Sequence, residues 1–346
     1  MRTKYLVTGA AGNLGSCIVG RLASRGDDVR ALVLPNDPLA ARLPQNVERC
    51  EGNVCDPDSL ESFFAAPADT EFVVIHTAAI VTTYPEFDRR VYDVNVEGTK
   101  HILAFCLRRP VKKLIYVSSS SAIPELPGDQ VMQEVSDFDP EKVIGFYAKT
   151  KAEASRAVME AARGGRLDAS LVFPTAICGP QDYAMGHLTH LIAVACAGKL
   201  PAGIVGGFDA VDVRDLANGV LLCADRGRPG EGYLLGGRFI TVREILHEVH
   251  LQTGSREVRQ MVPLWLANAA VPLCEVYYRL RHQKPVFTKF ALYNLTRNNN
   301  YSSEKACREL GYSARPFQET ISDTLRWLKE DGLIRFGRRR IVCGTV

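Results

Sequence analysis

The chain of 346 residues can bury a substantial core, and its formal net charge of +3 gives no reason to expect a nucleic-acid partner. Its ten cysteines are scattered without Cys-x-x-Cys or zinc-ligand spacing, which argues against a disulfide framework and against a metal site. No segment is apolar enough to span a membrane and the N-terminus runs straight into an expected strand, so we predict a cytoplasmic protein without a signal peptide.

A glycine-rich turn joins the first expected strand, at 3–8, to the first expected helix, at 13–25. It has the sequence Thr8-Gly9-Ala10-Ala11-Gly12-Asn13-Leu14-Gly15. Gly9 permits a tight turn, Gly12 leaves room for a pyrophosphate, and Gly15 lets helix and strand pack closely. The helix N-terminus offers unpaired N–H groups and the positive end of its dipole to phosphates. The turn therefore predicts a dinucleotide site.

The second expected strand, at 28–34, bears on the choice between NAD and NADP. NAD-binding proteins place an acidic residue at the end of this strand for the ribose 2′-hydroxyl, and NADP-binding proteins have a basic residue nearby. Here Val33 occupies the usual acidic position and Leu34 follows it. Asp37 comes late, and Arg30 lies on the wrong alternation of the strand. The sequence alone leaves both cofactors open.

Short β patterns alternate with helical patterns through the first half of the chain. Strands are expected at 3–8, 28–34, 46–50, 71–76, 112–118 and 168–173. Helices are expected between them, notably at 13–25, 57–65, 88–108 and 145–163. This alternation predicts an α/β fold built on a Rossmann-type, doubly wound parallel sheet.

The second half of the chain has a less regular pattern. Gly232-Tyr233-Leu234-Leu235 still predicts a strand, and the capping box that begins at Thr241 opens a helix through Val249. We expect an NAD(P)-binding domain over 1–175 and a smaller, interleaved C-terminal substrate domain over 176–330. Segments at about 205–250 are expected to return to the sheet, and 331–346 to form a basic tail.

A tyrosine and a lysine stand four residues apart in Tyr147-Ala148-Lys149-Thr150-Lys151. The pattern that follows is helical, so both side chains share one face. Upstream, the strand at 112–118 ends in Ser118-Ser119-Ser120-Ser121. In an open parallel sheet, chemistry takes place at the carboxyl ends of the strands. A hydroxyl there beside a tyrosine whose pKa a lysine lowers suits proton transfer to an alcohol or ketone.

Together these motifs resemble the extended short-chain dehydrogenase/reductase family, of the NAD-dependent epimerase/dehydratase type. The resemblance covers nearly the whole chain and is closest to dihydroflavonol-reductase-like and 3β-hydroxysteroid-dehydrogenase-like members. Besides the glycine turn, the serine strand and the Tyr/Lys helix, it rests on His76-Thr77-Ala78-Ala79, Asn95-Val96-Glu97-Gly98-Thr99, Pro174…Gly179-Pro180, Val211-Asp212-Val213-Arg214-Asp215 and Lys305-Ala306…Leu310-Gly311-Tyr312.

The resemblance implies a catalytic set of four residues. Tyr147 is implied as the acid/base, and Lys151 as the residue that tunes it and binds the nicotinamide ribose. Asn95 is implied to support the proton relay. Alignment with the family strand makes Ser119 the catalytic serine, while a slip in the alignment keeps the other three serines of the run, 118, 120 and 121, as alternatives.

The resemblance also implies which residues contact NAD or NADP. Asn53 stands where the family usually has an aspartate that contacts adenine, and an amide can still donate or accept a hydrogen bond there. The full expected set is Gly9, Ala11, Gly12, Asn13, Leu14, Gly15, Asn53, Val54, Ala78, Ala79, Tyr147, Lys151 and Pro174.

Family membership does not fix the reaction. Members include dehydrogenases, nucleotide-sugar epimerases and dehydratases, and proteins that bind the nucleotide without catalysis. The intact Ser119, Tyr147 and Lys151 argue against the last class. Phe173 stands where sugar-nucleotide members often have an arginine. We favour an NAD(P)-dependent oxidoreductase that interconverts a secondary alcohol and a ketone, with a nucleotide-sugar epimerase/dehydratase and a non-catalytic NAD(P)-binding protein as alternatives.

The expected substrate is a bulky, largely apolar small molecule such as a steroid, terpenoid or phenolic compound. An apolar wall with few charges suits such a molecule and suits a diphosphate poorly. The same residues also fit a buried helix pair at Met261–Leu280 or the contact of a homodimer, and these interpretations stay open. The residues of the wall are Pro263-Leu264-Trp265-Leu266, Val271–Leu280, Tyr277, Tyr278, Phe287, Phe290 and Tyr293.

Three further positions have two interpretations each. His76 either contacts the cofactor or packs at a strand end. Cys178, in the loop after the sixth strand, is either a reactive thiol or a small spacer, and we favour the spacer. His187 and His190 lie three residues apart without a further metal ligand, so we expect them to face solvent or substrate.

Overall fold

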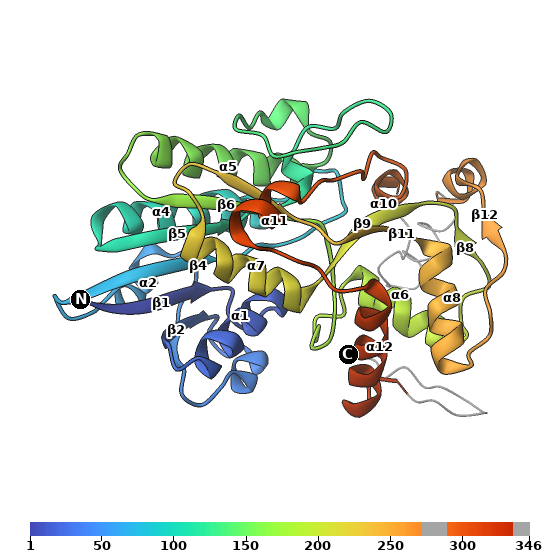
Figure 1. Ribbon diagram of the computed structural model, residues 1–346, viewed down its shortest axis with the longest axis horizontal. Coiled ribbons are helices and arrows are strands. Elements are labelled where there is room, and N and C mark those ends of the chain that lie inside the picture. Colours follow the sequence, from blue (N-terminus) through green and yellow to red (C-terminus); the bar gives the residue numbers. More distant parts are fainter. Residues whose placement is uncertain (272–288, 335–346) are drawn as a thin grey trace.

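Seven parallel strands form the central sheet of the computed structural model, which describes residues 1–271 and 289–334 (Figure 1). Across the sheet their order is β3-β2-β1-β4-β5-β6-β10, and every neighbouring pair is parallel. The connections change direction between β1 and β4, the switch point where such sheets bind ligands. The predicted α/β, doubly wound fold is confirmed. The strands are β1 (Arg2–Thr8), β2 (Asp28–Val33), β3 (Glu48–Glu51), β4 (Thr70–His76), β5 (Val111–Val117), β6 (Ala169–Pro174) and β10 (Gly232–Leu235).

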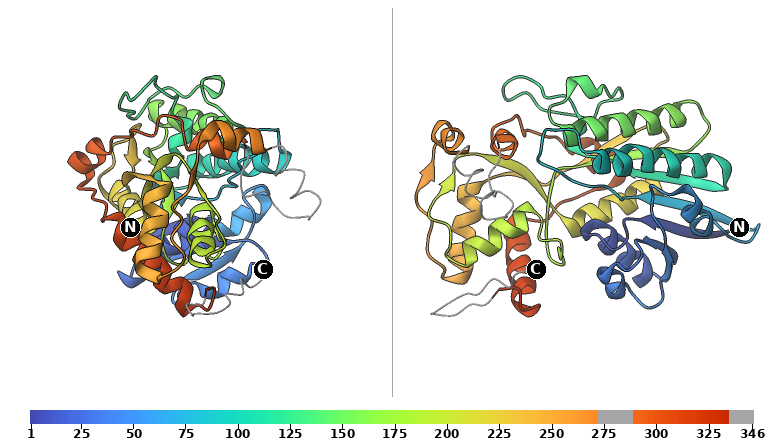
Figure 2. Two further views of the ribbon diagram at one scale, coloured as in Figure 1. Left: turned by 90° about the vertical axis from the view of Figure 1, so that its right-hand side faces the viewer. Right: turned by 180° about the vertical axis from the view of Figure 1, so that it is seen from behind.

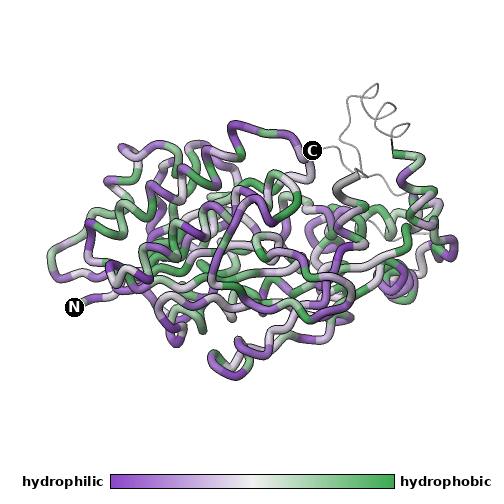
Figure 3. The backbone as a smooth tube through the Cα atoms, turned by 90° about the horizontal axis from the view of Figure 1, so that it is seen from above, coloured by the Kyte–Doolittle hydropathy of each residue, from purple (hydrophilic) through white to green (hydrophobic). Residues whose placement is uncertain are grey.

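Helices cover both faces of this sheet, so its strands bury side chains on both sides. Leu6 and Leu114 point into the core under α2, α4 and α5, whereas Val7 and Ile115 point into the core under α1, α7 and α11. Hydrophobic colour follows the central strands in Figure 3 and alternates with hydrophilic colour along the covering helices. The bounds of these helices are α1 (Asn13–Ser24), α2 (Pro57–Phe63), α4 (Gly98–Arg108), α5 (Phe146–Arg163), α7 (Val213–Arg226) and α11 (Glu304–Leu310).

The helix predicted at 88–108 is interrupted. Its first turn is α3 (Arg89–Tyr92), and a π-helical turn, Asp93–Glu97, links it to α4. The buried Asn95 lies in that turn. A π turn adds one residue to the helical repeat and is frequent at functional sites.

A second lobe lies beyond the carboxyl ends of the central strands (Figure 2). Its core is formed mainly by α6, α8 and α12, which pack together over a three-stranded sheet of order β11-β9-β7. The capping box at Thr241 is confirmed, and the helix it opens runs on to Thr253. The elements of this lobe are β7 (Ala176–Cys178), α6 (His187–Cys196), β8 (Gly203–Ile204), β9 (Gly207–Asp212), β11 (Arg238–Thr241), α8 (Val242–Thr253), β12 (Met261–Val262), α10 (Lys289–Asn294) and α12 (Phe317–Glu330).

The segment that begins at Met261 differs from the predicted buried helix pair. Met261–Val262 form a short strand, and a helix follows over 264–271. Trp265 is 71% exposed and Leu266 is 44% exposed, so the start of the predicted apolar wall faces outward. The remainder at 272–288, including Tyr277, Tyr278 and Phe287, lies outside the described residues, as do the arginines of the tail.

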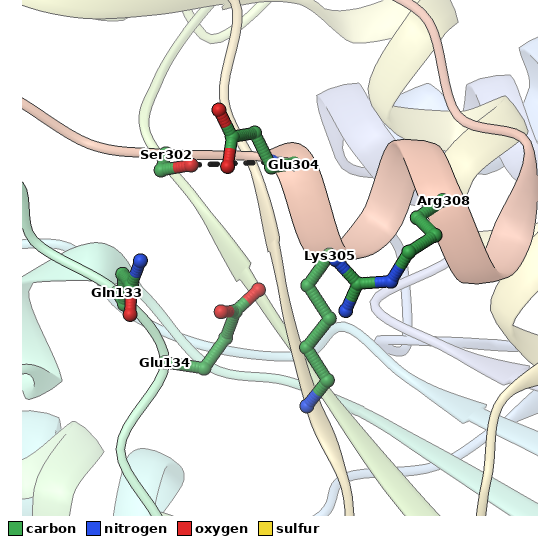
Figure 4. A pocket seen from close by; sticks show the side chains of 6 residues that line it. All are labelled: Gln133, Glu134, Ser302, Glu304, Lys305 and Arg308. Carbon is green, nitrogen blue, oxygen red and sulfur yellow. Dashed lines mark hydrogen bonds between the residues drawn. The ribbon is translucent and has the colours of Figure 1, made fainter.

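Charged side chains close the free edge of the central sheet at β10. Glu134 accepts a hydrogen bond from the Leu234 backbone N–H at 2.7 Å, and the Lys305 ammonium donates to the Gly232 carbonyl at 2.9 Å. Such side chains block pairing with a strand of another molecule. They line a cavity of about 370 Å³ at the β10 edge, which three strands separate from β1 (Figure 4). Its other lining residues are Gln133, Ser302, Glu304 and Arg308.

Candidate active site

The glycine turn after β1 lies against the loop after β4. Gly9 has φ +63°, and a Cβ there would lie 2.8 Å from the Ala78 backbone nitrogen. A Cβ on Gly15 would lie 2.1 Å from the Gly9 carbonyl oxygen. Both positions therefore require glycine, and the close packing brings two of the predicted cofactor-binding segments together at the switch point.

The N-terminus of α1 has the features of an anion site. Gly12 is its N-cap residue and provides no side-chain cap, so the first N–H groups of the helix are left for another acceptor. The Asn13 Oδ1 atom is buried without a hydrogen-bond partner among the described residues. An open helix N-terminus beside a buried unpaired polar atom fits the pyrophosphate of a dinucleotide.

One face of α5 lies along the end of β5 and makes a contact at each turn. The Lys151 ammonium donates to the Val117 carbonyl at 2.6 Å, and the Ser155 and Ser118 hydroxyls lie 2.6 Å apart. One turn before Lys151, the Tyr147 hydroxyl lies beside Ser119, which lowers the pKa of the phenol. This register brings together three of the four residues that the resemblance implied as catalytic.

The same register separates the four serines after β5. Ser118 is hydrogen-bonded to Ser155 and Ser120 lies beside Tyr301, while Ser121 lines a cavity that is described below. Ser119 is 9% exposed and pairs with Tyr147. Of the alternatives that the sequence leaves open, the geometry therefore favours Ser119 as the partner of the tyrosine.

Burial controls the protonation of the Tyr147–Lys151 pair. Burial raises the pKa of Tyr147 to about 12, and the neighbouring Ser119 hydroxyl offsets part of this increase. Burial lowers the pKa of Lys151, which is 1% exposed, to about 7. The direction for Tyr147 is opposite to the lowering that the sequence led us to expect, because the desolvation by burial outweighs the lowering by Ser119.

Tyr116 supports Lys151 from the side, and the sequence analysis missed it. Its ring centroid lies 4.6 Å from the Lys151 ammonium, a distance at which the ring face attracts a cation. The ring also stacks on His76 at 5.7 Å between centroids. The alternation of side chains along β5 indicates that Tyr116 points to the α5 side of the sheet. Only the packing of α5 against the sheet identifies which residues Tyr116 contacts.

His76 is buried and neutral, and it links β4 to β1 and to α4. Its Nδ1 lies 2.6 Å from the Thr8 hydroxyl and its Nε2 lies 3.0 Å from the Thr99 hydroxyl. Since Thr99 donates to the Asn95 carbonyl at 2.7 Å, it accepts from His76, which assigns the proton to Nε2. Burial and the charge of Lys151 lower the pKa of His76 to about 3. These contacts support the packing interpretation.

Asn95 joins the loop after β4 to α5. Its side chain exchanges two hydrogen bonds with the Ile80 backbone, at 2.8 and 3.0 Å, and donates to the Thr150 hydroxyl at 3.1 Å. Thr150 in turn donates to the Tyr147 carbonyl at 2.8 Å. Asn95 thus reaches the tyrosine through Thr150, and it holds the Ala78–Ala79 loop beside the site.

The other predicted contacts lie around the same edge of the sheet. Pro174 ends β6 and is buried, whereas Asn53 is exposed and its Oδ1 accepts from the Cys55 N–H at 3.0 Å. Val54 packs under α4, where a Cβ on Gly98 would lie 2.7 Å from its side chain. Whether these residues contact a cofactor stays a prediction.

Two observations bear on the remaining alternatives. The Leu34 side chain is 52% exposed after β2, and the Asp37 Oδ1 atom caps the turn Pro38–Arg42 by accepting from the Leu39 N–H at 2.9 Å. Burial raises the pKa of the Cys178 thiol to about 12, which keeps it protonated and unreactive at neutral pH.

No described helix has both the length and the apolar character needed to cross a membrane.

Comparison with known proteins defines the class of this chain. Residues 5–236 match the model of the NAD dependent epimerase/dehydratase family, and the chain belongs to that family. It is an enzyme fold of the extended short-chain dehydrogenase/reductase type with NAD as the family's cofactor, as the glycine turn and the Tyr/Lys helix indicated.

Two related proteins and one solved structure show which members of the family this chain resembles. The chain is 30% identical to the sterol demethylase protein B of Methylococcus capsulatus, over 95% of this chain and 99% of the relative. It is 26% identical to a 3-beta-hydroxysteroid dehydrogenase of Mycolicibacterium neoaurum, over 89% and 86% of the two chains. Among solved structures, that of gox2253 superposes with a TM-score of 0.81 at 28% identity, covering 96% of this chain and 98% of the other.

Proposed function

We propose that this protein is an NAD(P)-dependent oxidoreductase that interconverts a secondary alcohol and a ketone on a bulky, largely apolar small molecule. The observation that carries the proposal is the contact of the Tyr147 and Ser119 hydroxyls at the carboxyl end of β5, above the buried Lys151. The sterol and steroid names of two relatives support the substrate class. A nucleotide-sugar epimerase or dehydratase is the alternative.

In this proposal Tyr147, Ser119 and Lys151 each have a separate role in the proton transfer. When bound, NAD or NADP supplies the hydride acceptor or donor and, in its oxidised form, a positive charge. In oxidation the Tyr147 phenolate takes the hydroxyl proton of the alcohol, and in reduction the neutral Tyr147 phenol gives its proton to the ketone oxygen and becomes a phenolate. Ser119 donates a hydrogen bond to that oxygen, and Lys151 provides a positive charge beneath the phenol when it is protonated.

The test is a cofactor-reduction assay with NAD and with NADP across hydroxysteroid, terpenoid and phenolic alcohols. Epimerisation of UDP-glucose, which leaves no net reduced cofactor, is followed by analysis of the sugar product. We expect turnover of at least one apolar alcohol. Tyr147→Phe should lower kcat by roughly a hundredfold or more, the contribution of a positioned acid/base, while the affinity for the cofactor is retained.

A matched control removes another phenol that contacts α5. The Tyr92 hydroxyl donates to Glu153 at 2.9 Å, outside the Tyr147–Ser119 contact. Tyr92→Phe should keep wild-type turnover. Efficient epimerisation of UDP-glucose without activity on any apolar alcohol would favour the alternative, and near-normal turnover by Tyr147→Phe would refute the assigned role.

A further inference from the structure

A second cavity, of about 330 Å³, lies between the segment that follows Ser119 and the segment that precedes Tyr147. One wall follows Ser119 in the chain, from Ser121 to Gly128, and another precedes Tyr147, from Lys142 to Ile144. Tyr293 and Arg297 close the cavity from the C-terminal part of the chain. Its volume lies at the lower end of the range for small-molecule pockets.

Arg297 is the unusual residue of this cavity. Its Nε atom is buried and has no hydrogen-bond partner in the described parts of the chain. The guanidinium carbon lies 5.9 Å from the centre of the Tyr293 ring. A buried guanidinium donor without an acceptor is costly, because its hydration has been lost and nothing replaces it. Such a donor is satisfied when a ligand brings an anionic oxygen.

Both oxygen atoms of Glu125, the carboxylate in this cavity, already accept hydrogen bonds from the protein. The Glu125 Oε1 atom accepts from the Asn298 backbone N–H at 2.7 Å, and its Oε2 atom accepts from the Tyr293 hydroxyl. The other cation, Lys142, has a 64% exposed side chain and lies 3.7 Å from Asp139. Arg297, which is half-buried and whose Nε atom is fully buried, is therefore the less exposed of the two cations in the described lining.

We propose that this cavity binds the carboxylate of an otherwise apolar alcohol or ketone, with Arg297 as the donor; the inference rests on the proposed function and specifies its substrate class. Aliphatic side chains form most of the remaining lining, which suits an apolar body. The one half-buried cation neutralises one charge, whereas a diphosphate needs more and would meet Glu125. The aliphatic lining residues are Ile123, Leu126, Pro127, Val143 and Ile144.

The test compares an acid with its methyl ester, which differ only in charge at one end. A short pair is 4-acetylbenzoate and methyl 4-acetylbenzoate, and a long pair is 3β-hydroxy-5-cholenoic acid and its methyl ester. Binding to the NAD-loaded or NADH-loaded protein is measured by calorimetry, and turnover is followed beside it. We expect one pair to show an acid that binds roughly tenfold to a hundredfold more tightly than its ester.

In Arg297→Met the ratio of the Kd of the ester to the Kd of the acid should fall close to one. Arg297→Lys should keep part of the preference for the acid. Thermal denaturation shows that each variant is folded, and the lysine variant carries the test if the methionine variant is not. Arg308→Met is the matched control, because this arginine lies at the cavity near β10 and should not alter the ratio.

The outcomes separate the inference from the proposed function. Equal binding of acid and ester in both pairs, or a preference that survives Arg297→Met, overturns the carboxylate site even if alcohols are oxidised. A preference lost in Arg297→Met without any turnover of the panel supports the site and refutes the oxidoreductase. Binding of UDP-glucose that depends on Arg297, with no acid preference, assigns the residue to a diphosphate and overturns the inference.

Discussion

At the scale of single residues, burial sets the protonation of the groups in the candidate active site. Lys151 and Tyr147 are both shifted toward their neutral forms, which is the direction that desolvation imposes on a base and on an acid. A charged pair at this position would require additional positive or hydrogen-bonding partners. The shifts identify these residues as functional candidates, since strongly perturbed groups cluster at active sites.

His76 gives the sharpest prediction at this scale. Its pKa is about 3 in the folded protein and near 6.5 in an unfolded chain, so between these values only the unfolded chain binds the proton. The stability that the neutral ring contributes is therefore present above pH 6.5 and is lost as the pH falls toward 3. The shift corresponds to a contribution on the order of 5 kcal/mol.

Urea unfolding at several pH values between 7.5 and 4 measures this effect. His76→Gln can still hydrogen-bond but cannot be protonated, so its free energy of unfolding should fall less steeply with acid than that of the wild type. His190→Gln, at an exposed position, is the control. Identical slopes for wild type and His76→Gln would show that His76 does not hold the neutral state described above.

At the scale of elements, the sequence predicted the parts that have strong local signals. The six strands expected in the first half are confirmed within two residues at each end, since apolar runs between turn residues define them. The π turn at Asp93–Glu97 was not predicted, because one added residue hardly disturbs a helical pattern of apolar residues.

The turn between β1 and α1 allows a prediction about cofactor binding. A Cβ on Gly12 would lie 3.2 Å from the Gly9 carbonyl oxygen, which is tight but can be relieved by a small shift. We therefore expect Gly12→Val to fold and to lose NAD(P) binding, because its side chain occupies the space of the pyrophosphate. Calorimetric titration with NADH and NADPH measures the loss.

Gly20 is the matched control in the same helix. A Cβ there would meet nothing within 4 Å, and alanine is favoured over glycine inside a helix by roughly 1 kcal/mol. Gly20→Ala should bind the cofactor as the wild type does and unfold at a slightly higher temperature. Unchanged affinity in a folded Gly12→Val protein would remove the turn from the cofactor site.

At the scale of the whole molecule, the site depends on contacts between distant parts of the chain. Lys151 meets Val117 across 34 positions, and the Tyr293 hydroxyl meets Glu125 across 168. No local pattern specifies which of the apolar and aromatic residues near the C-terminus reach the cavity. The sequence therefore predicted Tyr147 and Lys151, which one helix holds together, but not Tyr116 or Arg297, which packing alone brings to their places.

An ionic network ties the C-terminal segment to α7. Arg315 donates to Asp215 through its backbone N–H at 2.8 Å and its side chain at 2.8 and 2.9 Å, and Asp215 is 9% exposed. Next to it, Arg214 bridges Asp212 to Asp323 of α12. This network fastens the helix of the outer lobe to a helix that covers the central sheet.

A double-mutant cycle tests the contribution of this network. In Asp215→Asn, Arg315→Gln and the double variant, the free energies of unfolding in urea should give a coupling of about 1–3 kcal/mol, because the pair is bidentate and largely shielded from solvent. Arg326 forms an exposed ion pair with Asp323, so Arg326→Ala should cost only about 0.5 kcal/mol or less. A coupling between Asp215 and Arg315 no larger than that value would mean that apolar packing of α12, rather than this ion pair, holds the two lobes together.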